Sequence, residues 1–307
     1  MTERSPSRLL PARGVLARGA FAGALLALAA ALPCLAASDG AGNAAAAGDR
    51  PMYSTRASVD WKGRVLTVEV KLDLAAAGLR LPEGRLTAER MVEHDIPALA
   101  KDAVFSLQAD SHRRVEDAVA DGTIGPEALV ALGGLFRVES SSLSKDMRRF
   151  ISTYSLRLDA VASLFLTGAS PSSIRAPLET LPTRDYTGIV IYAKGSLPVH
   201  GEDVEGEARP CLFPRVYDSD MDLVLDRSLV LPEVLYGAAD GGVLGYASAV
   251  GVEAGERVGS DPMRIMAIGL FGDQRTDYIV SREDALRILS SAGNRELLRR
   301  GKVVVVY

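Results

Sequence analysis

The stretch from Tyr186 to Val216 constrains the fold of this chain more than any other. It opens with Ile189–Tyr192, a short run of β-branched and aromatic residues with glycines on either side. Such a run is typical of a strand that is buried on both faces. After a polar loop, the chain returns through a segment that contains Pro210 and Pro214. Because proline cannot donate a hydrogen bond to a sheet, this return is predicted to lie at a sheet edge or a bulge.

Alternation of apolar and polar residues predicts a β-hairpin earlier in the chain. Residues Trp61–Arg64 supply the turn, and apolar residues then occupy every second position from Leu66 to Leu74. Apolar residues spaced by three and four favour helix within Thr87–Ala120, whereas Phe136–Leu166 returns to a strand-like alternation. The N-terminal region is therefore predicted to combine a hairpin and helices, and its sheet is expected to have one solvated face.

The C-terminal part of the chain adds short predicted strands at Asp222–Leu231 and Val234–Tyr236, a helix and a closing strand. Ser281 is a good N-cap for a helix that reaches Leu289, since acidic residues follow it in the first turn. Val303–Val306 is uniformly apolar, which is typical of an interior strand. The patterns together predict an α+β fold with an N-terminal hairpin-plus-helices region and a C-terminal mixed α/β sheet module.

The first 36 residues are predicted to be a signal peptide. Four arginines and one glutamate precede the apolar run Phe21–Leu32, which is too short to span a bilayer comfortably. Ala36 and Ala37 follow, and small residues of this kind suit cleavage by an export peptidase. We therefore expect an exported protein that is periplasmic or associated with the outer membrane. The alternative is a leader that is retained as a membrane anchor.

A cysteine within this leader adds lipidation as a further alternative. Cys34 is a candidate lipidation site, although Ala31 stands where leucine is usual and a proline directly precedes the cysteine. Membrane association is expected only if Cys34 is lipidated or the leader is retained. If Cys34 is removed with the leader, Cys211 is the only cysteine left and an internal disulfide is excluded. Cys211 is expected to be a small buried residue, with a reactive thiol as the alternative.

Composition predicts five segments along the chain. They are a signal peptide at 1–36, a flexible Ala/Gly-rich tether at 37–52, an N-terminal α+β region at 53–167, a Pro-rich linker at 168–183 and a C-terminal α/β domain at 184–307. Hydrophobic residues make up 48% of the chain and charged residues 24%, which is ordinary for a folded protein. The net charge of −4 becomes more negative when the basic leader is removed. This acidity argues against nucleic acid or an anionic membrane surface as the main partner.

Motif searches identify no metal, cofactor or catalytic site. His94, His112 and His200 lie far apart in the sequence and have no cysteine or histidine at metal-ligand spacing. Asp218–Asp222 alternates carboxylates as calcium loops do, but it lacks the glycine and glutamate that such loops require, so it is interpreted as a turn. Ser142–Lys145 matches a bare Ser-x-x-Lys pattern without its companion motifs. The hypothesis that the protein is a hydrolase rests on this pattern alone.

Several short pieces in the C-terminal part follow one another in a recognisable order. They are Thr187–Ile191, Arg209–Asp218, Leu235–Gly237, Gly245–Tyr246, Asp261–Ala267 and the valine-rich terminal strand. This order resembles the C-terminal part of bacterial LPP-type envelope lipoproteins, which include flagellar assembly lipoprotein P. The resemblance covers about residues 184–307. It implies a non-enzymatic α/β module that self-assembles or docks in the cell envelope, often near the flagellar base, and it supplies no catalytic residues.

These observations lead to two functional hypotheses. The first is an exported structural or scaffold protein of the envelope, with a flagellar association implied by the resemblance, that forms a homo-oligomer or docks to other envelope proteins. Its candidate interface lies in the proline-containing return, at Pro210, Phe213, Pro214, Arg215 and Tyr217. The alternative is a periplasmic module that binds a small ligand or a peptidoglycan fragment, which would need a concave pocket with convergent polar groups.

Overall fold

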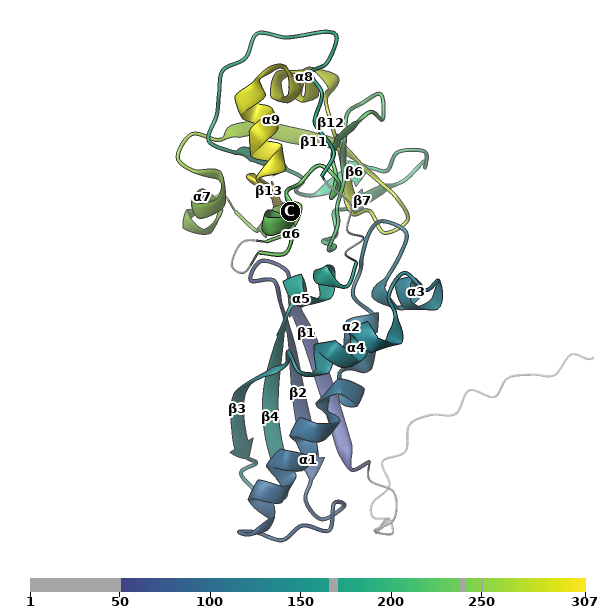
Figure 1. Ribbon diagram of the computed structural model, residues 1–307, viewed down its shortest axis with the longest axis vertical. Helices are drawn as coiled ribbons and strands as arrows, with labels where there is room; N and C mark the ends of the chain where they lie inside the picture. The colour runs from purple at the N-terminus through teal and green to yellow at the C-terminus, as the bar shows by residue number, and fades with distance from the viewer. Residues whose placement is uncertain (1–50, 166–170, 238–240, 250) are drawn as a thin grey trace, which may run out of the picture. The chain divides into compact units, whose positions relative to one another are not determined.

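The computed structural model describes residues 51–165, 171–237, 241–249 and 251–307. The predicted signal peptide, Cys34 and nearly all of the predicted tether lie outside these residues. Helices and strands are both abundant in the described part of the chain, with a strand and helix region first and a mixed sheet after it (Figure 1). The predicted α+β class is therefore confirmed. Within these residues, no helix is long and apolar enough to cross a membrane.

An antiparallel sheet of four strands forms the first region. Its strands, in the spatial order β1-β2-β4-β3, are β1 (Tyr53–Asp60), β2 (Val65–Asp73), β4 (Arg149–Arg157) and β3 (Arg137–Leu143). Every second residue of β2 is buried, as the alternation predicts. Helix α1 (Gly84–Leu99) runs along one face of this sheet (Figure 1) and buries Ala88, Val92 and Ile96, which recur at four-residue steps. The opposite face carries the polar residues of the strands.

Four shorter helices complete this region. They are α2 (Lys101–Phe105), α3 (Val115–Ala120), α4 (Pro126–Gly133) and α5 (Leu158–Ser163). The helix expected over Thr87–Ala120 is thus three helices, and a polar loop separates α2 from α3. The prediction that the strand continues past Arg157 is wrong, because Leu158, Asp159, Val161 and Ala162 are all buried. That spacing places them on one side of a helix, whereas a strand would turn alternate residues outward.

A mixed sheet of seven strands forms the second region. In spatial order its strands are β10 (Gly245–Ala247), β13 (Val303–Val306), β5 (Ile189–Tyr192), β11 (Met263–Phe271), β12 (Asp277–Val280), β8 (Val216–Tyr217) and β9 (Leu223–Leu225). As predicted, β5 and β13 are interior strands, and β5 pairs in parallel with β13 on one side and β11 on the other. The hairpin of β6 (Ser196–Pro198) and β7 (Glu205–Glu207) is separate.

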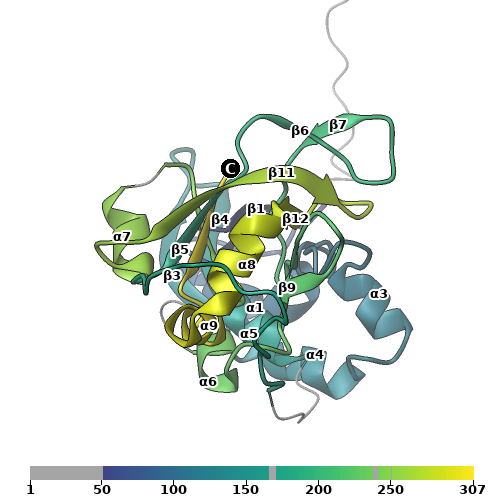
Figure 2. The same cartoon turned by 90° about the horizontal axis from the view of Figure 1, so that it is seen from above.

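Helices flank this second sheet. Both views place α8 (Arg282–Ser290) and α9 (Ala292–Arg299) beside it (Figures 1 and 2). On α7 (Val252–Val258), Val258 packs with Val190, Val304 and Val306 in a small cluster of its own. Ser281 caps α8 as predicted, since its hydroxyl accepts a hydrogen bond from the backbone N–H of Asp284 at 3.1 Å. A short helix, α6 (Pro232–Leu235), replaces a predicted strand because its proline suits the first turn.

Candidate functional site

The loop between α2 and α3 is bonded to the second sheet region. Backbone N–H groups of Leu212 and Phe213 donate to the carbonyls of Gln108 and Ala109 at 3.0 and 2.8 Å. The backbone N–H of Gln274 donates to the Ser111 carbonyl at 3.1 Å. We use the term junction for the three segments that meet here, 107–114, 209–215 and 271–278.

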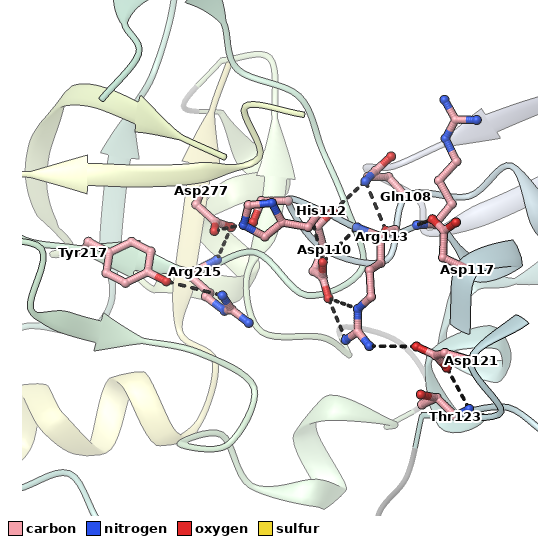
Figure 3. Close-up of polar contacts among 12 residues, drawn as sticks. Gln108, Asp110, His112, Arg113, Asp117, Asp121, Thr123, Arg215, Tyr217 and Asp277 are labelled. Carbon is pink, nitrogen blue, oxygen red and sulfur yellow. Dashed lines mark hydrogen bonds and ion pairs between the residues drawn. The ribbon is translucent and has the colours of Figure 1, made fainter. Parts of the chain in front are cut away.

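Asp110 gives the loop its shape (Figure 3). One carboxylate oxygen accepts the backbone N–H groups of His112 and Arg113 at 3.0 and 3.1 Å, and the other accepts the Arg113 guanidinium at 2.9 and 3.1 Å. The Gln108 amide donates to the carbonyls of Asp110 and Arg113. Burial acts to raise the pKa of Asp110, but the bonds from His112 and Arg113 outweigh it and hold the pKa below its ordinary value. The loop is therefore internally braced.

Asp277 is the most unusual acid in the junction. It is fully buried at the start of β12, where it accepts the Ser111 hydroxyl at 2.8 Å and the backbone N–H of Arg215 at 3.0 Å (Figure 3). Burial raises the pKa of Asp277 to about 6, although these two bonds and the Arg215 charge partly oppose it. Asp277 thus joins all three segments of the junction through one side chain.

A cleft of about 340 Å³ lies next to the junction. Its polar and aromatic lining consists of Trp61, Ser106, Gln108, Arg114, Arg209, Gln274 and Thr276. The ring of Trp61 is held edge-on against Tyr246, with the ring centroids 6.3 Å apart. Two arginines and no acidic residue line the cleft, so its lining is cationic.

Buried hydroxyl groups lie close to the cleft. The Tyr246 hydroxyl accepts the backbone N–H of Cys211 and donates to the Cys211 carbonyl, both at 3.0 Å. Cys211 is fully buried, as expected, and burial raises the pKa of its thiol, an effect that the adjacent Thr276 hydroxyl offsets only in part. Within the described residues, the hydroxyls of Thr276 and Tyr278 are buried and make no hydrogen bond of good geometry.

The five predicted interface residues all lie in or beside the junction. Pro210 lines the cleft, while Phe213 and Pro214 are buried, and Phe213 packs edge-on against Phe165 at a centroid distance of 5.2 Å. Arg215 and Tyr217 are partly exposed, and their side chains meet at 3.4 Å. The contacts that these residues make here are within the chain. Their contact with another protein stays a prediction.

The other sequence candidates are scattered. Ser142 is exposed on the edge strand β3, and Asp218 caps a turn between β8 and β9 by accepting the N–H groups of Asp220 and Asp222. His112 and His200 both lie against the ring of Phe271, with ring centroids 6.3 and 6.0 Å apart. Their separation in the sequence gave no indication of this shared neighbour. Across the described ranges, no three His, Cys, Asp or Glu residues gather in a way that could hold a metal.

Two successive parts of this α+β chain match models of bacterial protein domains. Residues 53–164 match the family model described as Treponema pallidum Tp0624, N-terminal domain. Residues 188–307 match the model described as Treponema pallidum Tp0624, second domain. The chain is therefore similar to the first two domains of that protein, in the same order. The comparison with curated proteins gives no match.

The resemblance to LPP-type lipoproteins and flagellar assembly lipoprotein P is wrong. The model that matches residues 188–307 is the second domain of Tp0624, which covers nearly all of the stretch assigned to that resemblance. The pieces that suggested it were short, and a buried parallel strand such as β5 requires a β-branched run in any fold of this kind. The implied flagellar association had no other support. The predicted linker at 168–183 lies between the two matched ranges.

Proposed function

We propose that this protein is an exported, non-enzymatic structural protein of the bacterial cell envelope that self-assembles or docks to envelope partners through the free edge of β1. Export rests on the basic and apolar leader in the first 36 residues. Docking rests on one observation, the long edge strand at the start of the folded region. A periplasmic or outer-membrane location follows from the leader and is part of the proposal.

The backbone of β1 supports this role. Strand β1 has eight residues, all of them paired with β2, and it is the outermost strand on its side of the sheet. The N–H of Asp73 donates to the carbonyl of Met52, so Met52 and Asp73 form a hydrogen-bonded pair. Such pairs recur at every second residue of an antiparallel strand, so Ser54, Arg56 and Ser58 are also hydrogen-bonded to β2. The N–H and C=O groups of the residues between them therefore point away from β2. No described residue pairs with these groups, and an unpaired row of this kind is a template for another strand.

The opposite edge of the same sheet is less suited to this. Strand β3 has an irregular register with β4 between Val138 and Ser140, and such bulges twist an edge strand away from regular pairing. Strand β1 has no such shift along its length. Its five residues from Ser54 to Ser58 are all exposed. A strand of a second copy or of another protein could therefore reach β1.

The proposal includes no reaction because Asp110, Ser111 and Asp277, the bonded side chains at the centre of the junction, are engaged in holding the chain. The Asp110 carboxylate accepts backbone N–H groups and the Arg113 guanidinium, while Asp277 accepts the Ser111 hydroxyl and the Arg215 N–H. Ser142 lies on the exposed face of an edge strand rather than beside a buried base. A Ser142→Ala variant is accordingly expected to leave the cellular phenotype unchanged.

Light scattering on the protein expressed from its full coding sequence tests the proposal. Mass would be measured across a range of concentrations for the wild type and for Ala57→Pro. Ala57 has its N–H on the free edge, so proline there blocks strand addition while the bonds to β2 remain. Ala57→Ser, which keeps the N–H, is the matched control. We expect oligomers for the wild type and the control, and a smaller species for Ala57→Pro.

A second measurement covers assembly on a foreign partner. A photo-crosslinking amino acid at position 57 in living cells should capture either a second copy or one envelope protein. Proline at residue 58 is unsuitable as a variant, because the N–H of Ser58 is hydrogen-bonded to β2. A wild-type monomer at every concentration, together with no specific crosslink from position 57, would refute docking through β1. If the wild type forms oligomers, equal masses for Ala57→Pro and Ala57→Ser would refute it as well.

A further inference from the structure

The cleft beside the junction has the properties of a ligand site. We propose that it binds a small organic anion, with a carboxylate or phosphate group held by Arg114 and Arg209. This goes beyond docking through β1, because it assigns a small-molecule site. The two proposals also have separate tests.

The charge of the lining supports an anionic ligand. Arg114 and Arg209 line the cleft and no acidic residue does, although the chain as a whole is acidic. Arg114 has an exposed pair with Glu116 at 3.3 Å, which contributes little in solvent. Within the described residues, the Arg209 guanidinium has no ion pair or hydrogen bond. A guanidinium presents a planar fork of donors that matches carboxylate and phosphate oxygens.

A buried polar atom inside the cleft supports a ligand of any kind. Thr276 is a fully buried residue of the cleft lining, and its hydroxyl makes no hydrogen bond of good geometry within the described part of the chain. A buried hydroxyl without a partner costs free energy, so one that remains calls for an explanation. The Gln274 side chain also lines the cleft without a hydrogen bond to described residues. A bound polar molecule would satisfy both.

The apolar residues of the lining and the volume of the cleft limit the ligand's size and shape. Trp61, Val59 and Pro210 give the cleft an apolar side, and the contact with Tyr246 holds the indole in place. A volume of about 340 Å³ is at the small end of ligand pockets, which typically span about 300–1,000 Å³. The cleft therefore suits a molecule of about the size of a monosaccharide acid, with one face against the indole and the acid toward the arginines.

Trp61 makes the proposal directly measurable. It is the only tryptophan in the chain, so intrinsic tryptophan fluorescence reports on the cleft without a label. The protein expressed from its full coding sequence would be titrated with N-acetylmuramic acid, glucose 6-phosphate and uncharged N-acetylglucosamine. We expect a saturable change with at least one acid, weakened by salt, and none with the uncharged sugar. Saturation with N-acetylmuramic acid would identify the bound group as a carboxylate, and saturation with glucose 6-phosphate would identify it as a phosphate.

Three variants separate binding from folding. Arg209→Gln should raise the Kd about tenfold or more, whereas Arg264→Gln removes the same charge from an exposed residue of β11 and should leave it unchanged. Thr276→Val should raise the Kd with little change in the urea midpoint, since the hydroxyl loses only its contact with the Cys211 thiol and no hydrogen bond of good geometry. No saturation with either acid at millimolar concentration would overturn the proposal. An equal response to the uncharged sugar, or equal Kd values for the two arginine variants, would also overturn it.

Discussion

Replacing Asp277 with asparagine should remove a specific pH dependence from the stability of this protein. The carboxyl is fully buried, and burial raises its pKa from 3.8 to about 6. Asparagine has the same shape, so its oxygen can still accept the Arg215 N–H while its amide nitrogen faces the Ser111 hydroxyl. The variant therefore removes the charge and keeps the geometry.

The sign follows from the direction of the shift. A carboxyl whose folded pKa is raised is protonated in both states below about pH 4, so its contribution to stability is greatest there. As pH rises from about 4 to about 6, the unfolded chain loses the proton first and the folded state becomes relatively less stable. The difference between 3.8 and about 6 corresponds to roughly 3 kcal/mol at neutral pH. Asp277→Asn should therefore gain stability over the wild type with rising pH, up to about that limit.

Urea unfolding followed by Trp61 fluorescence at pH 4, 5, 6 and 7 measures this difference. Other acids such as Asp110 have lowered pKa values and lose their contribution as pH falls, so the wild type minus the variant isolates Asp277. Asp203→Asn removes an exposed carboxylate from the loop between β6 and β7 and serves as the control. A difference in stability between the wild type and Asp277→Asn that stays constant from pH 4 to pH 7 would contradict a raised pKa of Asp277.

Two further predictions concern packing in the two sheet regions. Asp159→Asn leaves the Arg64 guanidinium, 4% exposed and 2.8 Å from Asp159, without its charge partner, and urea unfolding should show a loss of about 3–5 kcal/mol. An equal stability for wild type and variant would contradict the buried pair. Gly188→Ala places a methyl group 2.5 Å from the Cα and carbonyl oxygen of Val258 and should cost about 1–3 kcal/mol by the same assay. Gly255→Ala meets nothing within 4 Å and should not destabilise, so a similar loss in both would refute the contact.

The parts of the fold that follow from local pattern were predictable from the sequence. Because β2 is buried on one face only, its apolar and polar residues alternate. Because β5 and β13 are buried on both faces, their residues form apolar runs. Prediction failed at α5 and α6, which are one or two turns long. Segments of four to six residues are too short for a helical period to show, so the apolar residues in them resembled strands.

The junction was not predictable in the same way. Ser111 and Asp277 are separated by 166 residues, and nothing in the spacing of either indicates the other. Sequence did direct attention to Arg209–Asp218, but as a surface for other proteins. Its prolines suggested an irregular edge, and the structure shows that this irregular segment receives a loop from the first region of the same chain.

The junction also changes what the boundary between the two matched regions means. In sequence, the chain divides at the proline-rich stretch, and that stretch would be the natural place to cut or recombine it. In the folded protein, the loop around Asp110 is clasped by the other region through backbone bonds and through Asp277. A protease that nicks residues 171–183 would therefore leave two fragments that stay together under native conditions. Either region alone would lack the partner groups for these hydrogen bonds. We therefore expect the two regions to be gained, lost and exchanged together in evolution.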